Sequence, residues 1–122
     1  MRAYGLHPID TVLKTEAILI RSRKNLSEEH KKLVTLIKSR IAGVVAANKY
    51  AICTYNIQRE KLPVATLVTP GRRAPTISAL ETEGWVAVSS MVEKSRAAEI
   101  MDELESIGAE DILIFNLDNC RV

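Results

Sequence analysis

The apolar positions between residues 50 and 117 change period several times, which predicts a small domain that mixes strands and helices. Four short runs are strand-like, at Tyr50–Asn56, Pro75–Leu80, Trp85–Val92 and Asp111–Leu117. Two stretches with helical spacing lie between them, at Arg59–Val68 and Ser95–Ile107. The predicted order along the chain is therefore strand, helix, strand, strand, helix, strand.

This order is the split βαβ pattern of ferredoxin-like (ACT/PII-like) domains, so the predicted fold class is α+β, an antiparallel sheet with both helices on one face. Local signals indicate the helix ends. Pro63 is acceptable only in the first turn of the first helix, which ends before Gly71, a residue suited to a left-handed backbone. Ser95 is predicted to cap the second helix, and Gly108 to end it. The predicted buried face of that helix consists of Ala97, Ala98, Ile100, Met101, Leu104 and Ile107.

Alternation along the strand Trp85–Val92 predicts which side chains meet the helices. Val86, Val88 and Val92 would point toward them, whereas Ala87, Ser89 and Met91 would point away. The open face would then carry small, polar and flexible groups, which suits a partner domain or a small ligand. It could instead simply be solvated, as antiparallel sheets permit. We favour a covered face because Met91 and Trp85 would otherwise be exposed.

The first 48 residues predict a long helix preceded by two short strands. The strands are expected at Ile9–Leu13 and Glu16–Ile20, with a break at Lys14-Thr15. The helix is expected from about Ser27 to Ala47, capped by Asn25 or Ser27. Its apolar stripe is formed by Leu33, Leu36, Ile37, Ile41, Val44 and Val45, and its opposite face by Lys31, Lys32, Lys38 and Arg40.

Composition narrows the class of protein. The chain has 122 residues, of which 47% are apolar, and its 17 basic and 15 acidic residues leave a net charge of +2. This balance does not predict nucleic acid or an anionic membrane as the main partner. No window has the run of about 18 apolar residues that a membrane helix needs, and no apolar stretch of signal-peptide type follows Met1. A cytoplasmic location is therefore expected.

Candidate chemistry is sparse. Cys53 and Cys120 have no CxxC spacing, and His7 and His30 have no metal-ligand spacing, so no metal site is predicted. No nucleophile is paired with a base, and catalysis by this chain alone is not expected. The basic turn Gly71-Arg72-Arg73 could hold an anion or be a solvated turn. A βαββαβ domain can also be an RNA-binding RRM, but the glycine and aromatic pattern of that module is absent.

Several strings, taken in order, nevertheless resemble a known family. These are Met1-Arg2-Ala3-Tyr4-Gly5-Leu6, Thr15–Ile20, Arg40-Ile41-Ala42-Gly43-Val44-Val45, Gly71-Arg72-Arg73-Ala74-Pro75-Thr76, Gly84-Trp85-Val86-Ala87-Val88 and Asn119-Cys120-Arg121-Val122. Together they resemble the C-terminal regulatory domain of long-form ATP phosphoribosyltransferase, the glycosyltransferase that begins histidine biosynthesis. The resemblance implies that residues 1–24 are a two-stranded remnant of the catalytic portion, 25–48 a linking helix, and 49–122 the regulatory domain.

The resemblance also implies a function. The family condenses ATP with phosphoribosyl pyrophosphate, using Mg²⁺, and the substrate-holding residues would lie upstream, so this chain would be either a fragment or a free-standing regulatory piece. L-histidine would bind for feedback inhibition where regulatory domains of neighbouring subunits meet in a hexamer. By motif position, the residues that line that cleft would be Asn56, Arg72, Thr76, Met91 and Asp111.

One position departs from some family members, in which an aspartate stands where this chain has Asn56. Asparagine keeps a hydrogen bond to the ligand but loses the assistance of charge, on the order of 1 kcal/mol. Weaker histidine binding, or help from Asp111, is therefore expected. The alternative function is an assembly module, whose open sheet face drives oligomerisation without any ligand.

Overall fold

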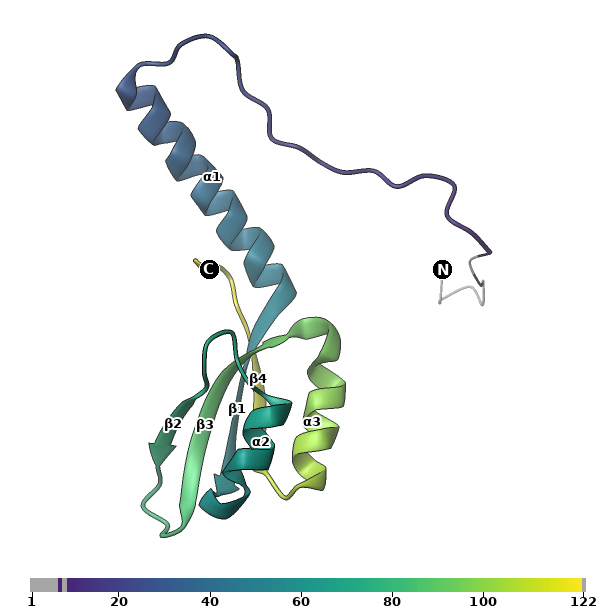
Figure 1. The fold of residues 1–122 in the computed structure, drawn as a ribbon, viewed down its shortest axis with the longest axis vertical. Coiled ribbons are helices and arrows are strands. Elements are labelled where there is room, and N and C mark those ends of the chain that lie inside the picture. Colours follow the sequence, from purple (N-terminus) through teal and green to yellow (C-terminus); the bar gives the residue numbers. More distant parts are fainter. Residues whose placement is uncertain (1–6, 8, 122) are drawn as a thin grey trace.

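The computed structural model describes residue 7 and residues 9–121, and it contains one sheet and three α-helices. Figure 1 shows a long helix standing away from a small domain in which two helices cover one face of the sheet. The elements in chain order are α1 (Glu28–Lys49), β1 (Tyr50–Gln58), α2 (Leu62–Val68), β2 (Thr76–Ala79), β3 (Trp85–Glu93), α3 (Ala97–Ser106) and β4 (Glu110–Asn116). Short 3₁₀ turns, Arg59–Lys61 and Lys94–Arg96, lead into α2 and α3.

The sheet confirms the predicted ferredoxin-like arrangement. Its strand order is β2-β3-β1-β4, and all three neighbouring pairs are antiparallel. Directly opposed residues share a face, so three pairs fix the register of the face away from the helices: Met91 with Ile52, Thr76 with Ser89, and Asn56 with Ala87. Strict alternation of buried and half-buried residues along β1 and β3 matches the predicted faces.

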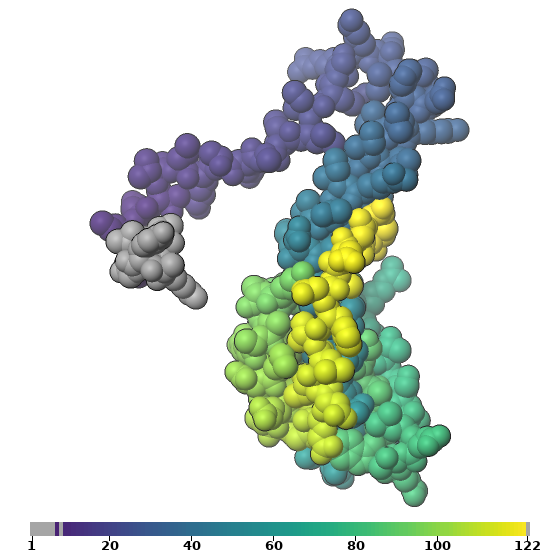
Figure 2. All heavy atoms as spheres, turned by 180° about the vertical axis from the view of Figure 1, so that it is seen from behind, coloured from purple at the N-terminus to yellow at the C-terminus, as the bar shows by residue number. Residues whose placement is uncertain are grey.

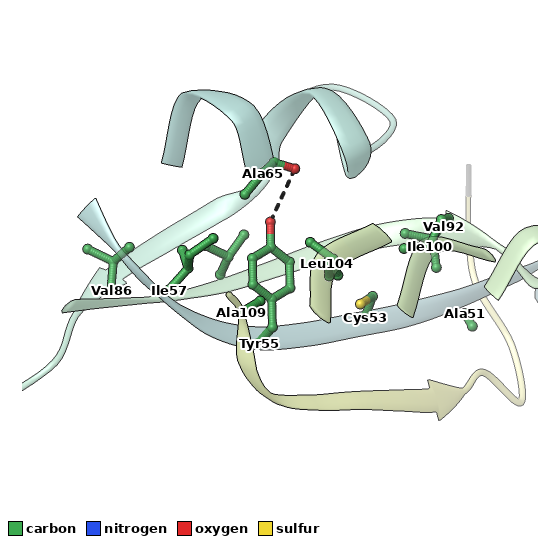
Figure 3. Close-up of a cluster of buried hydrophobic side chains, with 11 residues drawn as sticks. Ala51, Cys53, Tyr55, Ile57, Ala65, Val86, Val92, Ile100, Leu104 and Ala109 are labelled. Atoms are coloured by element: carbon green, nitrogen blue, oxygen red, sulfur yellow. Dashed lines mark hydrogen bonds between the residues drawn. The ribbon is translucent and has the colours of Figure 1, made fainter. Parts of the chain in front are cut away.

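The core lies between the sheet and α2 and α3 (Figure 3). Its fully buried side chains include Tyr55 and Ile57 from β1, Val86 and Val88 from β3, and Leu104 from α3. Val86, Val88 and Val92 face the helices, as predicted from the alternation. On α3, Ile100 and Leu104 are buried, and Ala97, Met101 and Ile107 are half-buried.

Two details of α3 differ from the prediction. Ser95 does not cap the helix, because it lies inside the 3₁₀ turn and the cap position is Arg96, which makes no side-chain cap hydrogen bond. Ala98 is exposed, so the buried stripe is narrower than expected. The 3₁₀ turn at Lys94–Arg96 shifts the cap position of the α-helix by one residue, from Ser95 to Arg96.

The long helix begins where the sequence predicts. The side chain of Ser27 accepts a hydrogen bond from the backbone N–H of His30, and Glu28 and Glu29 occupy the first turn. Only Gly43 and Ala47 of α1 are buried. The apolar stripe from Leu33 to Val45 is about half exposed, since nothing within the described chain packs on it.

The two strands expected at residues 9–13 and 16–20 are not formed. Residues 9–27 are extended in Figure 1 and belong to no strand of the described chain. Ile9 and Val12 are fully exposed, and Ile18 and Ile20 are mostly exposed. A strand exists only when a neighbour supplies its hydrogen bonds, and no segment of the described chain lies alongside. That these runs join a sheet completed by an upstream portion stays a prediction.

Candidate functional site

The structure places the five candidate residues around the open face of the sheet. Asn56 on β1, Thr76 on β2 and Met91 on β3 all point to the side away from α2 and α3, as their register partners show. Arg72 lies in the loop between α2 and β2, and Asp111 is the second residue of β4. The five residues therefore come from four strands and one loop around a single face.

A shallow concavity brings three of these five residues together. It has a volume of about 320 Å³ and includes Arg72, Thr76 and Met91 in its lining. The remaining lining residues are Ile52, Arg73, Ala74, Ser89, Ser90 and Arg121, among which the sequence had indicated only Arg73, in a basic turn that could hold an anion. Alternation could have identified Ile52 and Ser89, because both share the face of Met91. Nothing in the local sequence indicates that Arg121 reaches this face.

Asn56 and Asp111 lie outside the concavity and contact each other instead. The Asn56 side-chain amide donates a hydrogen bond of 2.9 Å from Nδ2 to Oδ2 of Asp111. Asp111 has a φ of 52°, and it is the one residue other than glycine in the left-handed region within the described chain. The pairing of β1 with β4 shifts register here, between Thr54 and Asn56.

The backbone at Asp111 is a costly conformation, typically about 1 to 3 kcal/mol for a residue other than glycine. Aspartate tolerates it better than most residues, because its short side chain can form local hydrogen bonds. The result is a carboxylate presented at the rim of the open face and held by Asn56. Such outliers concentrate at binding sites, which makes this corner a candidate contact for a cationic group.

The loop that carries Arg72 is fastened by a buried polar network. Thr69, which is fully buried, meets the Tyr55 hydroxyl at 2.7 Å. The carbonyl of Thr69 accepts a hydrogen bond of 3.0 Å from the hydroxyl of Ser90 on β3. Gly71 then turns the chain with a φ of 67°, the left-handed conformation predicted for it. The network fixes the loop to β1 and β3, so the backbone position of Arg72 is determined by the core.

The charges around the concavity are one-sided. Arg72, Arg73 and Arg121 line it, and none of its lining residues is acidic. In the described part of the chain the ion pairs are Lys31 with Glu28 and Arg96 with Glu99, so these three guanidinium groups have no carboxylate partner there. The hydroxyl groups of Thr76 and Ser89 add neutral donors. This set of groups suits a carboxylate or another small anion.

Within residues 7 and 9–121, no three His, Cys, Asp or Glu side chains come together as metal ligands. None of the helices described is both long and apolar enough to span a membrane.

Comparison with known proteins shows which family the chain resembles. The family model described as "HisG, C-terminal domain" matches residues 47–119. The chain is 58% identical over 122 residues to ATP phosphoribosyltransferase of Yarrowia lipolytica, and 52% identical over 122 residues to that of Saccharomyces cerevisiae, with all of the chain aligned in both cases. It is 50% identical over 121 residues, 99% of its length, to ATP phosphoribosyltransferase of Schizosaccharomyces pombe.

The chain spans about 40% of the length of these relatives: 40% of the first two proteins and 39% of the third. The matched range 47–119 covers more than half of the chain and coincides with the sheet and the two helices packed on it. The βαββαβ order, the antiparallel sheet and the family match agree, and the chain therefore belongs to the HisG C-terminal domain family.

Proposed function

We propose that this chain is the regulatory part of an ATP phosphoribosyltransferase and binds L-histidine for feedback inhibition, with no catalytic residue of its own. The observation that carries the proposal is the open sheet face, which combines an acid-free concavity at Arg72, Thr76 and Met91 with a separate carboxylate at Asp111. Free histidine is a zwitterion, so a specific site needs both kinds of group. Family membership supplies the choice of histidine.

Each group of the ligand has a fitting partner on this face. A guanidinium from Arg72 would bind the carboxylate of histidine, and the Thr76 hydroxyl would add a hydrogen bond. Met91 would pack against the imidazole edge, as a flexible thioether can. Asp111, with Asn56, would accept hydrogen bonds from the ammonium or the imidazole. The hydrogen bond of 2.9 Å between Asn56 and Asp111 supports a role for Asp111 in compensating for Asn56.

The separation of these partners favours a site shared between two copies. Thr76 on β2 and Asn56 on β1 are two strands apart, with β3 between them. Neighbouring strands lie about 4.8 Å apart, so the two side chains are separated by roughly 10 Å or more. One histidine cannot easily contact both on one face. A cleft formed by two regulatory domains would bring Arg72 of one copy near Asp111 of the other, and the ligand would then promote association.

The rest of the enzyme enters as part of the same proposal. An upstream catalytic domain would condense ATP with phosphoribosyl pyrophosphate in the cytoplasm, with Mg²⁺ held by residues outside this chain. The assembly would be a homo-oligomer, a hexamer by family resemblance. The half-exposed stripe on α1 and the exposed apolar residues of segment 9–20 supply surface for contact with that domain.

Calorimetric titration with L-histidine tests the proposal. We expect saturable heat. If the site joins two copies, the heat per mole of protein should grow with protein concentration. Thr76→Ala should weaken binding about three- to tenfold, the usual worth of a neutral hydrogen bond. Asp111→Asn should weaken it tenfold or more, because a charged acceptor is lost. Asparagine is chosen because it tolerates the left-handed backbone at this position, which alanine does not.

Ser78→Ala provides the matched control. Ser78 lies on β2, on the same face as Thr76, but it does not line the concavity. Its replacement should leave histidine affinity unchanged. Absence of saturable heat from the unaltered chain at every protein concentration tested would contradict the proposal, and equal affinities of all the variants would place the site elsewhere.

A ligand-free assembly module is the second candidate, and one observation favours it. Leu113 and Phe115 on β4 are each 52% exposed. Their register partners Thr54 and Ile52 place them on the open face. Apolar side chains on an otherwise uncovered face suit a contact between copies. Under this alternative the chain would associate to the same extent with and without histidine, which sedimentation at several protein concentrations measures.

A further inference from the structure

The C-terminal tail of the chain, residues 117–121, packs against the long helix. Figure 2 shows the chain leaving β4 and continuing along the lower part of α1. The backbone N–H of Cys120 donates a hydrogen bond of 3.2 Å to the carbonyl oxygen of Gly43 in the C-terminal part of α1. This contact joins positions 77 residues apart in the sequence. The tail therefore connects α1 directly to the C-terminal end of β4, the strand that carries Asp111.

Only glycine at position 43 leaves enough space for this contact. A Cβ atom at position 43 would lie 2.7 Å from the backbone oxygen of Cys120, and it would also overlap side-chain atoms of Asn119 and Arg121. Glycine is a poor helix former, and its place inside a 22-residue helix is therefore explained by the tail that approaches it. Gly43 and Ala47 are the buried residues of α1, and Gly43 lies directly against the tail.

The tail brings a third cation to the concavity on the open face. Arg121 lines that concavity together with Arg72 and Arg73. It also lines the hollow of about 360 Å³ beside Gly43. Its guanidinium donates to the side-chain oxygen of Asn119, and in the described part of the chain it has no carboxylate partner. Arg121 is therefore placed between α1 and the site.

We propose that Arg121 binds the anionic group of the ligand at this concavity, and that Gly43 is the positioning residue that places it there by docking the tail on α1. For L-histidine the anionic group is the carboxylate, and in this form the inference rests on the proposed function. Docking of the tail and binding of the ligand favour each other, because both use Arg121 in one position. Occupancy of the site thereby stabilises the contact with α1, the helix that leads toward the N-terminal part of the chain.

Titration of the 122-residue chain with L-histidine tests this inference. Arg121→Gln should weaken binding by about tenfold or more, the effect of one charge-assisted hydrogen bond. Arg121→Lys should recover part of the loss, because it keeps the charge without the planar fork. Arg59→Gln removes the same charge at the other end of β1, outside this concavity, and should bind like the unaltered chain. The loss in Arg121→Gln should shrink at high salt.

The Gly43→Ala variant tests the positioning role. It should weaken histidine binding to a similar degree, and combining it with Arg121→Gln should give little further loss, since both act through one guanidinium. Circular dichroism melting checks that each variant is folded. If the fold-losses in histidine affinity of the two single variants multiply in the double variant, Gly43 acts on general stability. That result would overturn its positioning role.

Failure of this inference is separable from failure of the proposed function. Histidine binding by the unaltered chain, with Arg121→Gln binding equally well, overturns the inference and leaves the proposed function standing. If the unaltered chain does not bind histidine, titration with inorganic phosphate decides the matter. Phosphate binding that is weakened by Arg121→Gln and not by Arg59→Gln supports an anion site there. No binding, or binding unaffected by Arg121→Gln, overturns it.

Discussion

The buried hydroxyl of Tyr55 offers the sharpest test of how the core supports the site. Tyr55 is 1% exposed, and its hydroxyl lies 2.7 Å from the Thr69 hydroxyl and 3.4 Å from the carbonyl oxygen of Ala65 in the middle of α2 (Figure 3). Tyr55→Phe removes one oxygen and leaves the ring in place. It therefore isolates the network from the packing.

The expected cost follows from what remains after the substitution. Thr69 can still donate its own hydrogen bond of 3.2 Å to the Ala65 carbonyl, so no buried polar atom is left without a partner. The loss is then that of a single net hydrogen bond in the core, about 1 to 1.5 kcal/mol. For a domain of this size, each kcal/mol of lost stability lowers the midpoint of thermal unfolding by roughly 4 to 8 °C.

Urea and thermal unfolding, followed by circular dichroism, measure the change. Tyr50→Phe is the matched control, since Tyr50 is half-buried and its hydroxyl makes no hydrogen bond within the described chain. A cycle with Thr69→Val should give a coupling of about 0.5 to 1.5 kcal/mol, as expected of residues in contact. A Tyr55→Phe variant as stable as the unaltered chain, within a few tenths of a kcal/mol, would refute the reasoning.

Two further predictions concern the core. Leu104→Ala should destabilise the domain by about 2 to 5 kcal/mol, because Leu104 is fully buried at 0% exposure; chemical unfolding measures this, and a cost below 1 kcal/mol would contradict it. Burial raises the pKa of the Cys53 thiol from about 9.0 to about 11. The unfolded thiol therefore ionises first as the pH rises, so stability that is fully present below pH 9 should fall between about pH 9 and 11. Cys53→Ala should flatten that fall in unfolding curves recorded at each pH, and an unchanged slope would contradict the assignment.

Much of the fold could be predicted because local signals and burial agree. Alternation along Trp85–Glu93 is a property of the strand itself, and it correctly assigned Val86 and Val88 to the core and Met91 to the open face. The start of α1 was equally local, since Ser27 caps the helix from a neighbouring turn. The prediction that Ser95 caps α3 was wrong because it depended on tertiary packing and not on a local signal. A capping residue and a residue in a 3₁₀ turn look alike until the packing of α3 selects one.

The candidate site could be predicted only in part. Family resemblance named Arg72, Thr76 and Met91, and alternation independently placed Met91 on the open face. The strand register then showed that Thr76 shares that face. Only the tertiary structure showed that Asn56 and Asp111 form a separate pair, because a register shift and a left-handed backbone bring their side chains together. Neither feature has a pattern that can be read from the residues nearby.

The sequence by itself determined the periods, the caps and hence the order of elements, because these depend on residues within a few positions of each other. The tertiary structure alone decided which distant residues share a surface. Segment 9–20 is β-prone yet forms no strand in the described chain, since a strand needs a partner. Arg121 and Gly43 meet because of the sheet order, which places β4 at an edge next to β1. The chain beyond β4 therefore continues onto α1, where only a glycine leaves room for it.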